Sequence, residues 1–366
     1  KTSNMHFSPK TLLLSCLLGA VIIPATKATD ASNENVKICM DPETKEAPWP
    51  FSLFIPPKCD GLERKAIVHL PPLPDAKGEK PKIPLVINIH ALGSYDLFQQ
   101  IYTNFDEIAD EEKFVVVYPN GHASARVATK NPGPLGKTFN AGGCCADACH
   151  TEPKIDDIGF FRKLVEHIKT EMPKNHNFEV DTQRIYATGM SNGGFMTNRV
   201  ACEMSDIVAA VVPVAGPLMN EKADGTDKFM WTSDPFLCAP GRPVPLMHLH
   251  SREDPIVPFN GSTQFGFPAI ESSSIKKWKS INGVADAEPV VTYDEDITKC
   301  TSYGPGTDAS VTLCVMESNL HCWPGKDLPL QCDSEIGNRY IWEFFSNHTL
   351  EGGFSPPTKA NGKDEL

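Results

Sequence analysis

A short glycine-flanked turn in the middle of the chain constrains the fold more than any other feature. The segment Gly189-Met190-Ser191-Asn192-Gly193 follows a strand-like run and opens a helix-like run. A serine at such a turn has its hydroxyl exposed and a helix N-terminus behind it, and the glycines permit the sharp turn and close packing of helix on strand. The pattern predicts a nucleophilic Ser191; a plain glycine-rich turn is the alternative interpretation.

Strand-like and helix-like segments alternate along the rest of the chain. Residues 85–90 and 114–118 are continuous apolar runs, which is typical of parallel strands covered on both faces. Residues 156–171 carry apolar positions at helical spacing, and 311–316 is again strand-like. The alternation predicts an α/β fold with a mostly parallel central sheet and helices on both faces.

The segments divide into one catalytic domain and its extensions. We find no internal repeat and no linker between two cores, so residues 61–350 are expected to form a single α/β catalytic domain. A polar N-terminal arm, 29–60, precedes this domain. Residues 217–243 form a polar, proline-containing insertion near the expected site, and a polar tail, 351–366, ends the chain.

Charge and hydropathy exclude two classes of partner. The chain has 34 Lys and Arg against 46 Asp and Glu, a net charge of −12, which repels phosphates and argues against nucleic-acid binding. Beyond the first 28 residues no stretch is long and apolar enough to span a bilayer, which takes ~20 residues. We therefore expect neither a nucleic-acid partner nor a membrane span; oligomeric state is not indicated.

The two ends of the chain carry targeting signals. Lys10 precedes an apolar run at 12–23, and small residues at Thr26 and Ala28 are typical of a secretory signal peptide cleaved near Ala28. A membrane anchor is the alternative, but the run is short for a span. Residues 363–366 read KDEL, a retrieval signal bound by its receptor. We expect the chain in the endoplasmic reticulum lumen or elsewhere in the secretory pathway, with secretion as the alternative.

Cysteine usage agrees with an oxidising compartment. The chain has 12 cysteines, and loss of the one in the signal peptide leaves an odd number, so at least one is free or bonded between molecules. No C-x-x-C motif is present, which argues against a thioredoxin-like oxidoreductase. Residues 144–150, with three cysteines and His150, could form a zinc cluster, but disulfide bonding is favoured and no metal is expected. The neighbours Cys300/Cys314 and Cys322/Cys332 are candidate pairs.

Two N-x-S/T sequons offer glycosylation sites in such a compartment. They begin at Asn260 and Asn347. Asn347 follows the last helix-like segment, and we expect it to carry a glycan. Asn260 follows the loop of the expected acid and would lie near the mouth of the site.

A nucleophilic serine needs a base, an orienting acid and an oxyanion hole. Asp254 follows the strand-like run 244–250 and is the predicted acid, with neighbouring Glu253 as its rival. His321 lies between strand 311–316 and the last helix and is the predicted base. The backbone N–H groups of Leu92, after the first buried strand, and of Asn192 are the expected oxyanion donors.

Three further residues near these loops have alternative interpretations. His248 and His250 lie in or at the end of a core strand and are expected to serve packing. Trp323, beside the predicted base, is expected to bind substrate as an aromatic wall; a core tryptophan is the equally favoured alternative.

Five motifs in order resemble one known family, the bacterial polyhydroxybutyrate depolymerases and feruloyl esterases. They are residues 139–145 (FNAGGCC), 155–160 (IDDIGF), 186–194 (YATGMSNGG), 254–261 (DPIVPFNG) and 321–325 (HCWPG). The resemblance covers roughly residues 60–345. It implies an α/β-hydrolase fold, a serine carboxylesterase activity through Ser191, Asp254 and His321, and no cofactor.

The chain departs from this family at three places. It has His90-Ala91 where the family usually has His-Gly, and alanine tolerates fewer backbone angles than glycine. It has Ser251-Arg252 in place of Gly-Thr before the acid, and its insertion 217–243 is longer than usual.

The sequence thus predicts a serine ester hydrolase that works through an acyl-enzyme. The resemblance implies feruloyl or acetyl glycan esters, or hydroxyalkanoate-type esters, as the substrate classes. A catalytically inactive α/β-hydrolase that serves as a lumenal binding protein is the alternative, and the complete triad argues against it.

Overall fold

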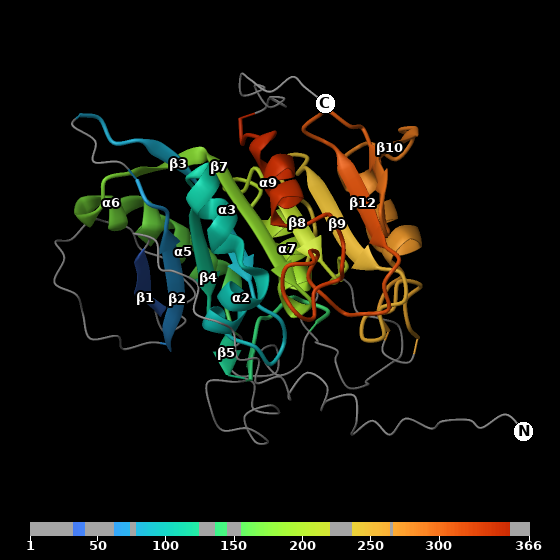
Figure 1. The fold of residues 1–366 in the computed structure, drawn as a ribbon, viewed down its shortest axis with the longest axis horizontal. Helices are drawn as coiled ribbons and strands as arrows, with labels where there is room; N and C mark the ends of the chain where they lie inside the picture. Colours follow the sequence, from blue (N-terminus) through green and yellow to red (C-terminus); the bar gives the residue numbers. More distant parts are fainter. Residues whose placement is uncertain are drawn as a thin grey trace, which may run out of the picture. The chain divides into compact units, whose positions relative to one another are not determined.

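A ten-stranded sheet, ordered β1-β2-β4-β3-β7-β8-β9-β12-β11-β10, organises the computed structural model (Figure 1). In that order the strands span Ser32–Met40, Leu62–Leu70, Val115–Pro119, Lys82–Ile89, Glu179–Met190, Ala210–Val214, Leu246–Ser251, Val311–Met316, Thr298–Tyr303 and Pro289–Glu295. The structure describes residues 32–40, 62–73, 78–123, 136–144, 155–219, 236–263 and 266–351. All of these belong to one compact unit, residues 31–366.

The middle of the sheet is parallel and its edges are antiparallel. Strands β4, β3, β7, β8, β9 and β12 pair in parallel, whereas β1 and β2 at one edge and β11 and β10 at the other pair antiparallel. The parallel strands are almost wholly buried, as their continuous apolar runs predict. The predicted mostly parallel α/β sheet is confirmed.

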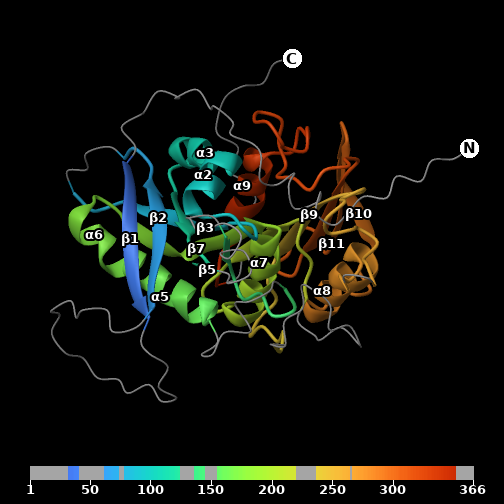
Figure 2. The same cartoon turned by 90° about the horizontal axis from the view of Figure 1, so that it is seen from below.

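Helices cover both faces of this sheet (Figure 2). On one face lie α2 (Asp96–Thr103), α3 (Phe105–Glu112) and α9 (Asn338–Ser346). On the other lie α5 (Asp157–Thr170), α7 (Asn192–Glu203) and α8 (Lys276–Ile281). The remaining elements of the described residues are α6 (Met172–Asn175), the π-helical turn η2 (Ile270–Ile275) and a small hairpin of β5 (His122–Ala123) and β6 (Lys137–Thr138).

Each face has its own apolar core, because successive strand residues point to opposite sides. Val86 of β3 packs in the cluster with Phe105 and Trp342, whereas its neighbour Ile87 packs in the cluster with Phe161 and Trp278. Among the described residues, no helix is long and apolar enough to cross a membrane.

The predicted N-terminal arm needs correction, because part of it belongs to the sheet. Strand β1 pairs antiparallel with β2 over its whole length and buries Val36 and Ile38. Asn33 also accepts a hydrogen bond from Gln100 Nε2 and pairs with His69 Nδ1, at 3.0 and 3.1 Å. The predicted signal peptide, arm residues 29–31 and 41–60, insertion residues 220–235 and tail residues 352–366 lie outside the described residues.

Disulfide bonds link several elements in the C-terminal half of the chain. Cys300–Cys314 joins β11 to β12 and Cys322–Cys332 closes a loop after β12, so both candidate pairs are confirmed. A third bond, Cys202–Cys238, was not predicted. Cys144 is also disulfide-bonded, whereas Cys145 and His150 lie outside the described residues. No group of side chains in the described part of the chain could hold a metal ion.

Candidate active site

The predicted nucleophile lies on a strained turn between β7 and α7. Ser191 has φ 55° and ψ −117°, which is an unusual conformation for a residue with a side chain. Hydrogen bonds hold it there: its N–H donates to Val214 O, and its carbonyl accepts from Phe195 N–H, both at 2.9 Å. The turn therefore has the geometry that the glycine-flanked motif predicts.

The two flanking glycines allow this turn to touch β3. A Cβ atom on Gly189 would lie 2.6 Å from the carbonyl oxygen of Ile89, and one on Gly193 would lie 2.0 Å from the same atom. Both distances are too short for any side chain. The glycines thus bring the Ser191 turn directly against the end of β3, where the segment with Leu92 begins.

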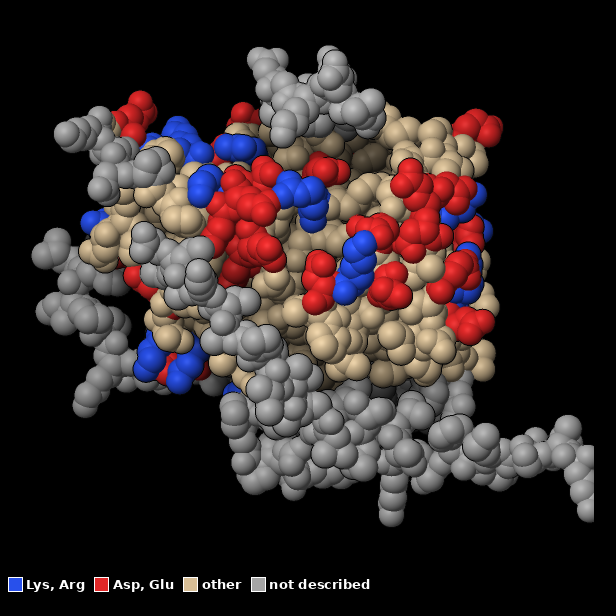
Figure 3. All heavy atoms as spheres, viewed as in Figure 1, with Lys and Arg blue, Asp and Glu red and all other residues tan. Residues whose placement is uncertain are grey.

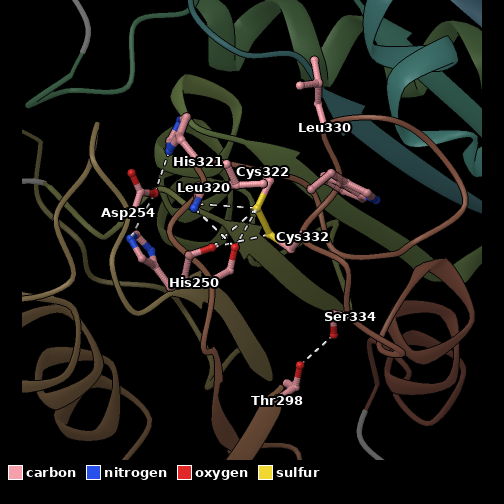
Figure 4. The surroundings of a disulfide bond; sticks show 12 residues. His250, Asp254, Thr298, Leu320, His321, Cys322, Leu330, Cys332 and Ser334 are labelled. Carbon is pink, nitrogen blue, oxygen red and sulfur yellow. Dashed lines mark hydrogen bonds and ion pairs between the residues drawn. A yellow bond between two sulfur atoms is a disulfide. The ribbon is translucent and has the colours of Figure 1, made fainter. Parts of the chain in front are cut away.

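Asp254 and His321 meet at the same edge of the sheet (Figure 4). His321 Nδ1 lies 2.7 Å from Asp254 Oδ2. Asp254 follows β9 and His321 follows β12, and these strands are parallel neighbours, so their carboxyl ends lie side by side. Glu253 is exposed, so Asp254 is the acid that the structure pairs with His321.

The Asp254 carboxylate is buried and well hydrogen-bonded. Its Oδ1 accepts from the backbone N–H groups of Ile256 and Val257, each at 2.8 Å. Since it has no exposed surface, these donors stabilise a charge that would otherwise be costly in the interior. The loop therefore presents an oriented acceptor for an imidazole N–H.

The other nitrogen of His321 is left available. Because Nδ1 donates to Asp254, Nε2 carries a lone pair in the neutral ring. Nε2 is buried and has no hydrogen-bond partner among the described residues. The structure shows no hydrogen bond between Ser191 and His321; such bonds often tighten only when substrate binds.

A buried histidine pair, His248 and His250, supports the Asp254 loop. His250 Nε2 donates to Val257 O at 2.8 Å and lies 3.5 Å from Asp254 Oδ2. Its Nδ1 therefore accepts from His248 Nε2, at 3.1 Å. Burial lowers the pKa of His250 to about 4 and that of His248 well below its usual value, so both rings are neutral. The sequence predicted only a packing role for these histidines and did not reveal the contact of His250 with Asp254.

A disulfide fixes the loop that carries His321. Cys322, the next residue, is bonded to Cys332. Ser251, at the end of β9, has its hydroxyl 3.6 and 3.4 Å from the two sulfur atoms. The loop after β12 is thus held both to itself and to the strand that precedes Asp254.

Trp323 does not form a wall of the site, which corrects the substrate-binding assignment. The side chain is fully buried and its Nε1 donates to Asn338 Oδ1 at 2.9 Å. Its ring packs edge-on against Phe105. The core alternative is therefore the one that the structure supports.

The segment with Leu92, the first expected oxyanion donor, is held by its neighbours. Ser94 N–H donates to Ala91 O, and Gly93 N–H donates to Lys137 O at 2.8 Å. His90 Nε2 accepts from Gly121 N–H, and burial lowers the pKa of His90 to about 3, so its neutral ring donates through Nδ1 to Ala91 O. Gly93 takes a positive φ of 77° but Ala91 does not, so the alanine is accommodated.

The other expected donor, Asn192, is fixed by its side chain. Its Oδ1 accepts from Phe139 N–H at 2.8 Å and its Nδ2 donates to Phe139 O at 3.0 Å. Asn192 is the first residue of α7, where the backbone N–H has no partner within the helix. Its N–H is therefore available to an acceptor outside the helix.

A buried ion pair holds the segment that fixes Asn192. Arg64 Nη2 donates to Asp157 Oδ1 at 2.6 Å, and both side chains are almost fully buried. Asp157 Oδ2 accepts from the backbone N–H of Asn140, next to Phe139. This network explains why the motifs at 139–145 and 155–160 occur together.

The two sequons differ in their surroundings. Asn260 is exposed on the loop that follows Asp254. Asn347 caps the end of α9 and is half-buried, and its Oδ1 is buried without a hydrogen-bond partner among the described residues.

Comparison with known proteins shows which proteins this chain resembles in sequence. The chain is 29% identical over 226 residues to feruloyl esterase B of Piromyces equi, covering 60% of this chain and 36% of that protein. It is 26% identical over 177 residues to a bifunctional acetylxylan esterase/xylanase of Neocallimastix patriciarum, covering 48% and 20%. It is 26% identical to an oxidized polyvinyl alcohol hydrolase of Sphingopyxis, covering 72% and 71%. The chain is a relative of known esterases.

The matched part of this chain spans about a third or less of the length of the first two relatives. Among solved structures, the acetyl xylan esterase from Aspergillus awamori matches with a TM-score of 0.52 and 14% identity, over 77% of this chain and 94% of that one. This match confirms the α/β-hydrolase fold. No family model matches the chain. The relatives bear out the resemblance to feruloyl esterases, and none of these four proteins is named a polyhydroxybutyrate depolymerase.

The buried Arg64–Asp157 ion pair leads to a prediction about stability. Asp157→Ala leaves the Arg64 charge buried and uncompensated, so we expect the free energy of unfolding to fall by about 3–5 kcal/mol. Asp206→Ala, which breaks the exposed ion pair with Arg162, is the control and should cost less than about 1 kcal/mol. Denaturant unfolding measures both, and equal losses would contradict the role given to the buried pair.

The histidine pair gives a second prediction. His250→Leu removes the donor to Val257 O and the neighbour of Asp254, so we expect the kcat of ester hydrolysis to fall about tenfold with little change in KM. His248→Leu is the comparison variant: it removes the donor to His250 Nδ1 but leaves His250 in contact with Val257 O and Asp254, so it should lower kcat less. If both variants lose stability alike and keep their kcat, the pair serves packing only.

Proposed function

We propose that the chain is a serine carboxylic-ester hydrolase with Ser191 as nucleophile, His321 as base and Asp254 as orienting acid. The observation that carries the proposal is the 2.7 Å contact between His321 Nδ1 and Asp254 Oδ2, which leaves Nε2 with a free lone pair in the interior. The strained Ser191 turn lies at the same edge of the sheet. The esterase relatives support the same reaction class.

The reaction proceeds in two steps through an acyl-enzyme. Ser191 Oγ attacks the ester carbonyl while His321 Nε2 takes the hydroxyl proton, and that proton then goes to the departing alcohol. A water molecule, deprotonated by His321 in the same way, hydrolyses the acyl-serine and returns the free serine and a carboxylic acid. No cofactor takes part in this chemistry.

Two groups of contacts lower the barrier. Asp254 keeps the proton of His321 on Nδ1 and stabilises the imidazolium that forms after proton transfer. The backbone N–H groups of Leu92 and Asn192 stabilise the tetrahedral oxyanion. The hydrogen bonds to Ala91 O and Phe139 N–H restrain the segments that carry or contact these two residues, which supports this role.

The relatives define the substrate classes to examine first. Their names point to feruloyl and acetyl esters of glycans, and the family resemblance adds hydroxyalkanoate-type esters. Three disulfides among the described residues agree with a secretory or extracellular protein. The predicted signal peptide and the KDEL sequence favour residence in the endoplasmic reticulum lumen through the KDEL receptor.

A substitution of the nucleophile tests the activity. Purified protein should hydrolyse p-nitrophenyl acetate, and Ser191→Ala should lower kcat by about 10⁴-fold or more while the thermal unfolding curve is retained. Ser273→Ala, at an exposed serine of η2, is the control and should keep full activity. A folded wild-type protein without turnover would favour the inactive binding protein instead.

The choice of acid is tested separately. Asp254→Asn should lower kcat by about 10²–10⁴-fold, because the wrong histidine tautomer is then favoured. Glu253→Gln should have little effect, since Glu253 is exposed. The reverse order of effects would assign the acid to Glu253.

A glycan on Asn260 would restrict the mouth of the site. We expect Asn347 to be glycosylated and, if Asn260 is as well, the substrate to be small. Asn260→Gln should then raise activity on large esters more than on p-nitrophenyl acetate, with Asn347→Gln as control. Peptide mapping after endoglycosidase H treatment measures occupancy, and full occupancy with rapid hydrolysis of an intact polymer would contradict this account.

A further inference from the structure

Helix α2 is amphipathic in the reverse sense to a normal surface helix. Its apolar residues Leu97, Phe98 and Ile101 are 44%, 43% and 41% exposed. Its polar residues Gln99 and Thr103 are 1% and 0% exposed. A surface helix normally buries its apolar stripe, so the orientation of α2 needs both a physical cause and a function.

Hydrogen bonds to the sheet cause the orientation. Gln99 Nε2 donates to Asn88 Oδ1 at 2.8 Å, and Asn88 Nδ2 donates to Thr103 Oγ1 at 3.0 Å. Asn88 is a buried polar residue in the otherwise apolar strand β3. Because turning the helix over would leave these buried groups without partners, the polar side is committed to the sheet and the apolar stripe faces outward.

Helix α2 is joined at both ends to segments that carry expected site residues. Helix α2 begins four residues after Leu92, the expected oxyanion donor. At its other end, the Tyr102 hydroxyl accepts from Trp323 N–H at 2.9 Å and donates to Leu330 O at 3.0 Å. Trp323 is two residues from His321.

Further apolar surface continues from the helix. The Phe98 and Tyr102 rings stack with centroids 5.7 Å apart, and Leu330 is 62% exposed. Figure 4 shows Leu330 pointing away from the Cys322–Cys332 bond. We call Leu97, Phe98, Ile101, Tyr102 and Leu330 the α2 surface.

The chemistry of the α2 surface defines its occupant. None of its side chains is charged, and the next helix, α3, is acidic, with acidic side chains gathered over it in Figure 3. An anionic ligand is therefore disfavoured. An uncharged hydrocarbon chain that binds here removes apolar surface from water and meets no electrostatic repulsion. The link to the site at both ends favours a ligand that is already held there.

We propose that the α2 surface binds the aliphatic acyl chain of an ester substrate. The acyl half is assigned because α2 continues directly from the segment expected to hold the carbonyl oxygen, and that oxygen belongs to the acyl group. The inference rests on the proposed esterase activity and names a substrate class for it: neutral esters with an extended aliphatic acyl chain.

An acyl-chain series tests the inference. The p-nitrophenyl esters of acetic, butyric and octanoic acid share one leaving group, and each is used below the concentration at which it aggregates. The variants are Phe98→Gln and the double variant Leu97→Gln/Ile101→Gln, because glutamine keeps helix propensity and removes apolar surface. Val291→Thr changes an exposed apolar residue on β10, away from α2, and serves as control.

The wild-type protein should prefer octanoate to acetate in kcat/KM. The double variant should lower the ratio of octanoate to acetate kcat/KM by about tenfold, mainly through KM, and Phe98→Gln by about threefold to fivefold. The control should keep the wild-type ratio, and circular dichroism should show that all variants are folded.

Three results would overturn the inference. A ratio that does not change in either α2 variant means that the acyl chain binds elsewhere. An equal loss on acetate and octanoate means that α2 acts on the catalytic residues and not on the chain. A dimer that dissociates in the variants, with an unchanged ratio, means that a second copy covers the surface. Absence of hydrolysis of all three esters by the folded wild-type protein would instead refute the proposed activity itself.

Discussion

The hydrogen bond between His321 and Asp254 is the interaction on which the rest of the site depends. A carboxylate with no exposed surface is costly unless donors surround it, and this one has two backbone N–H groups as well as the imidazole. Those N–H groups belong to the loop that His250 holds through Val257 O. The Cys322–Cys332 bond restrains the histidine on its own loop. The acid and the base are therefore each positioned independently before they meet.

The same edge of the sheet gathers the other parts of the site because the central strands are parallel. The Ser191 turn, the Leu92 segment and the Asp254 and His321 loops follow β7, β3, β9 and β12, and the carboxyl ends of these strands lie together. Gly189 and Gly193 let the first two approach at backbone distance. The Arg64–Asp157 pair holds the Phe139 segment through the hydrogen bond from Asn140 N–H to Asp157. One sheet edge thus carries every group that the proposed acyl transfer needs.

The features predictable from sequence are those with a local physical signal. Continuous apolar runs predicted the buried strands, and β12 begins and ends where its run does. The order of serine, acid and histidine predicted that Asp254 and His321 would meet. Cys300 and Cys314 pair across adjacent antiparallel strands, a short-range contact that sequence proximity indicates.

The features that sequence missed depend on distant contacts. Strand β1 pairs with β2, although residues 41–61 separate them in the sequence. Cys202 and Cys238 form a disulfide at a sequence separation of 36 residues. Trp323 is buried because α9 and α3 pack over it, which no neighbouring residue reveals. The outward turn of α2 depends on the side-chain hydrogen bond between Gln99 and Asn88, a single polar residue in the preceding strand β3. In each case tertiary partners decide the outcome.

A fluorophosphonate adduct tests the central claim, that Ser191 is a nucleophile activated by His321, most directly. Treatment of the purified protein should add one phosphonyl group to the intact mass, and peptide mapping should place it on Ser191. The rate of labelling should fall strongly in His321→Gln. An adduct on a different residue, or labelling at an unchanged rate without His321, would contradict the account.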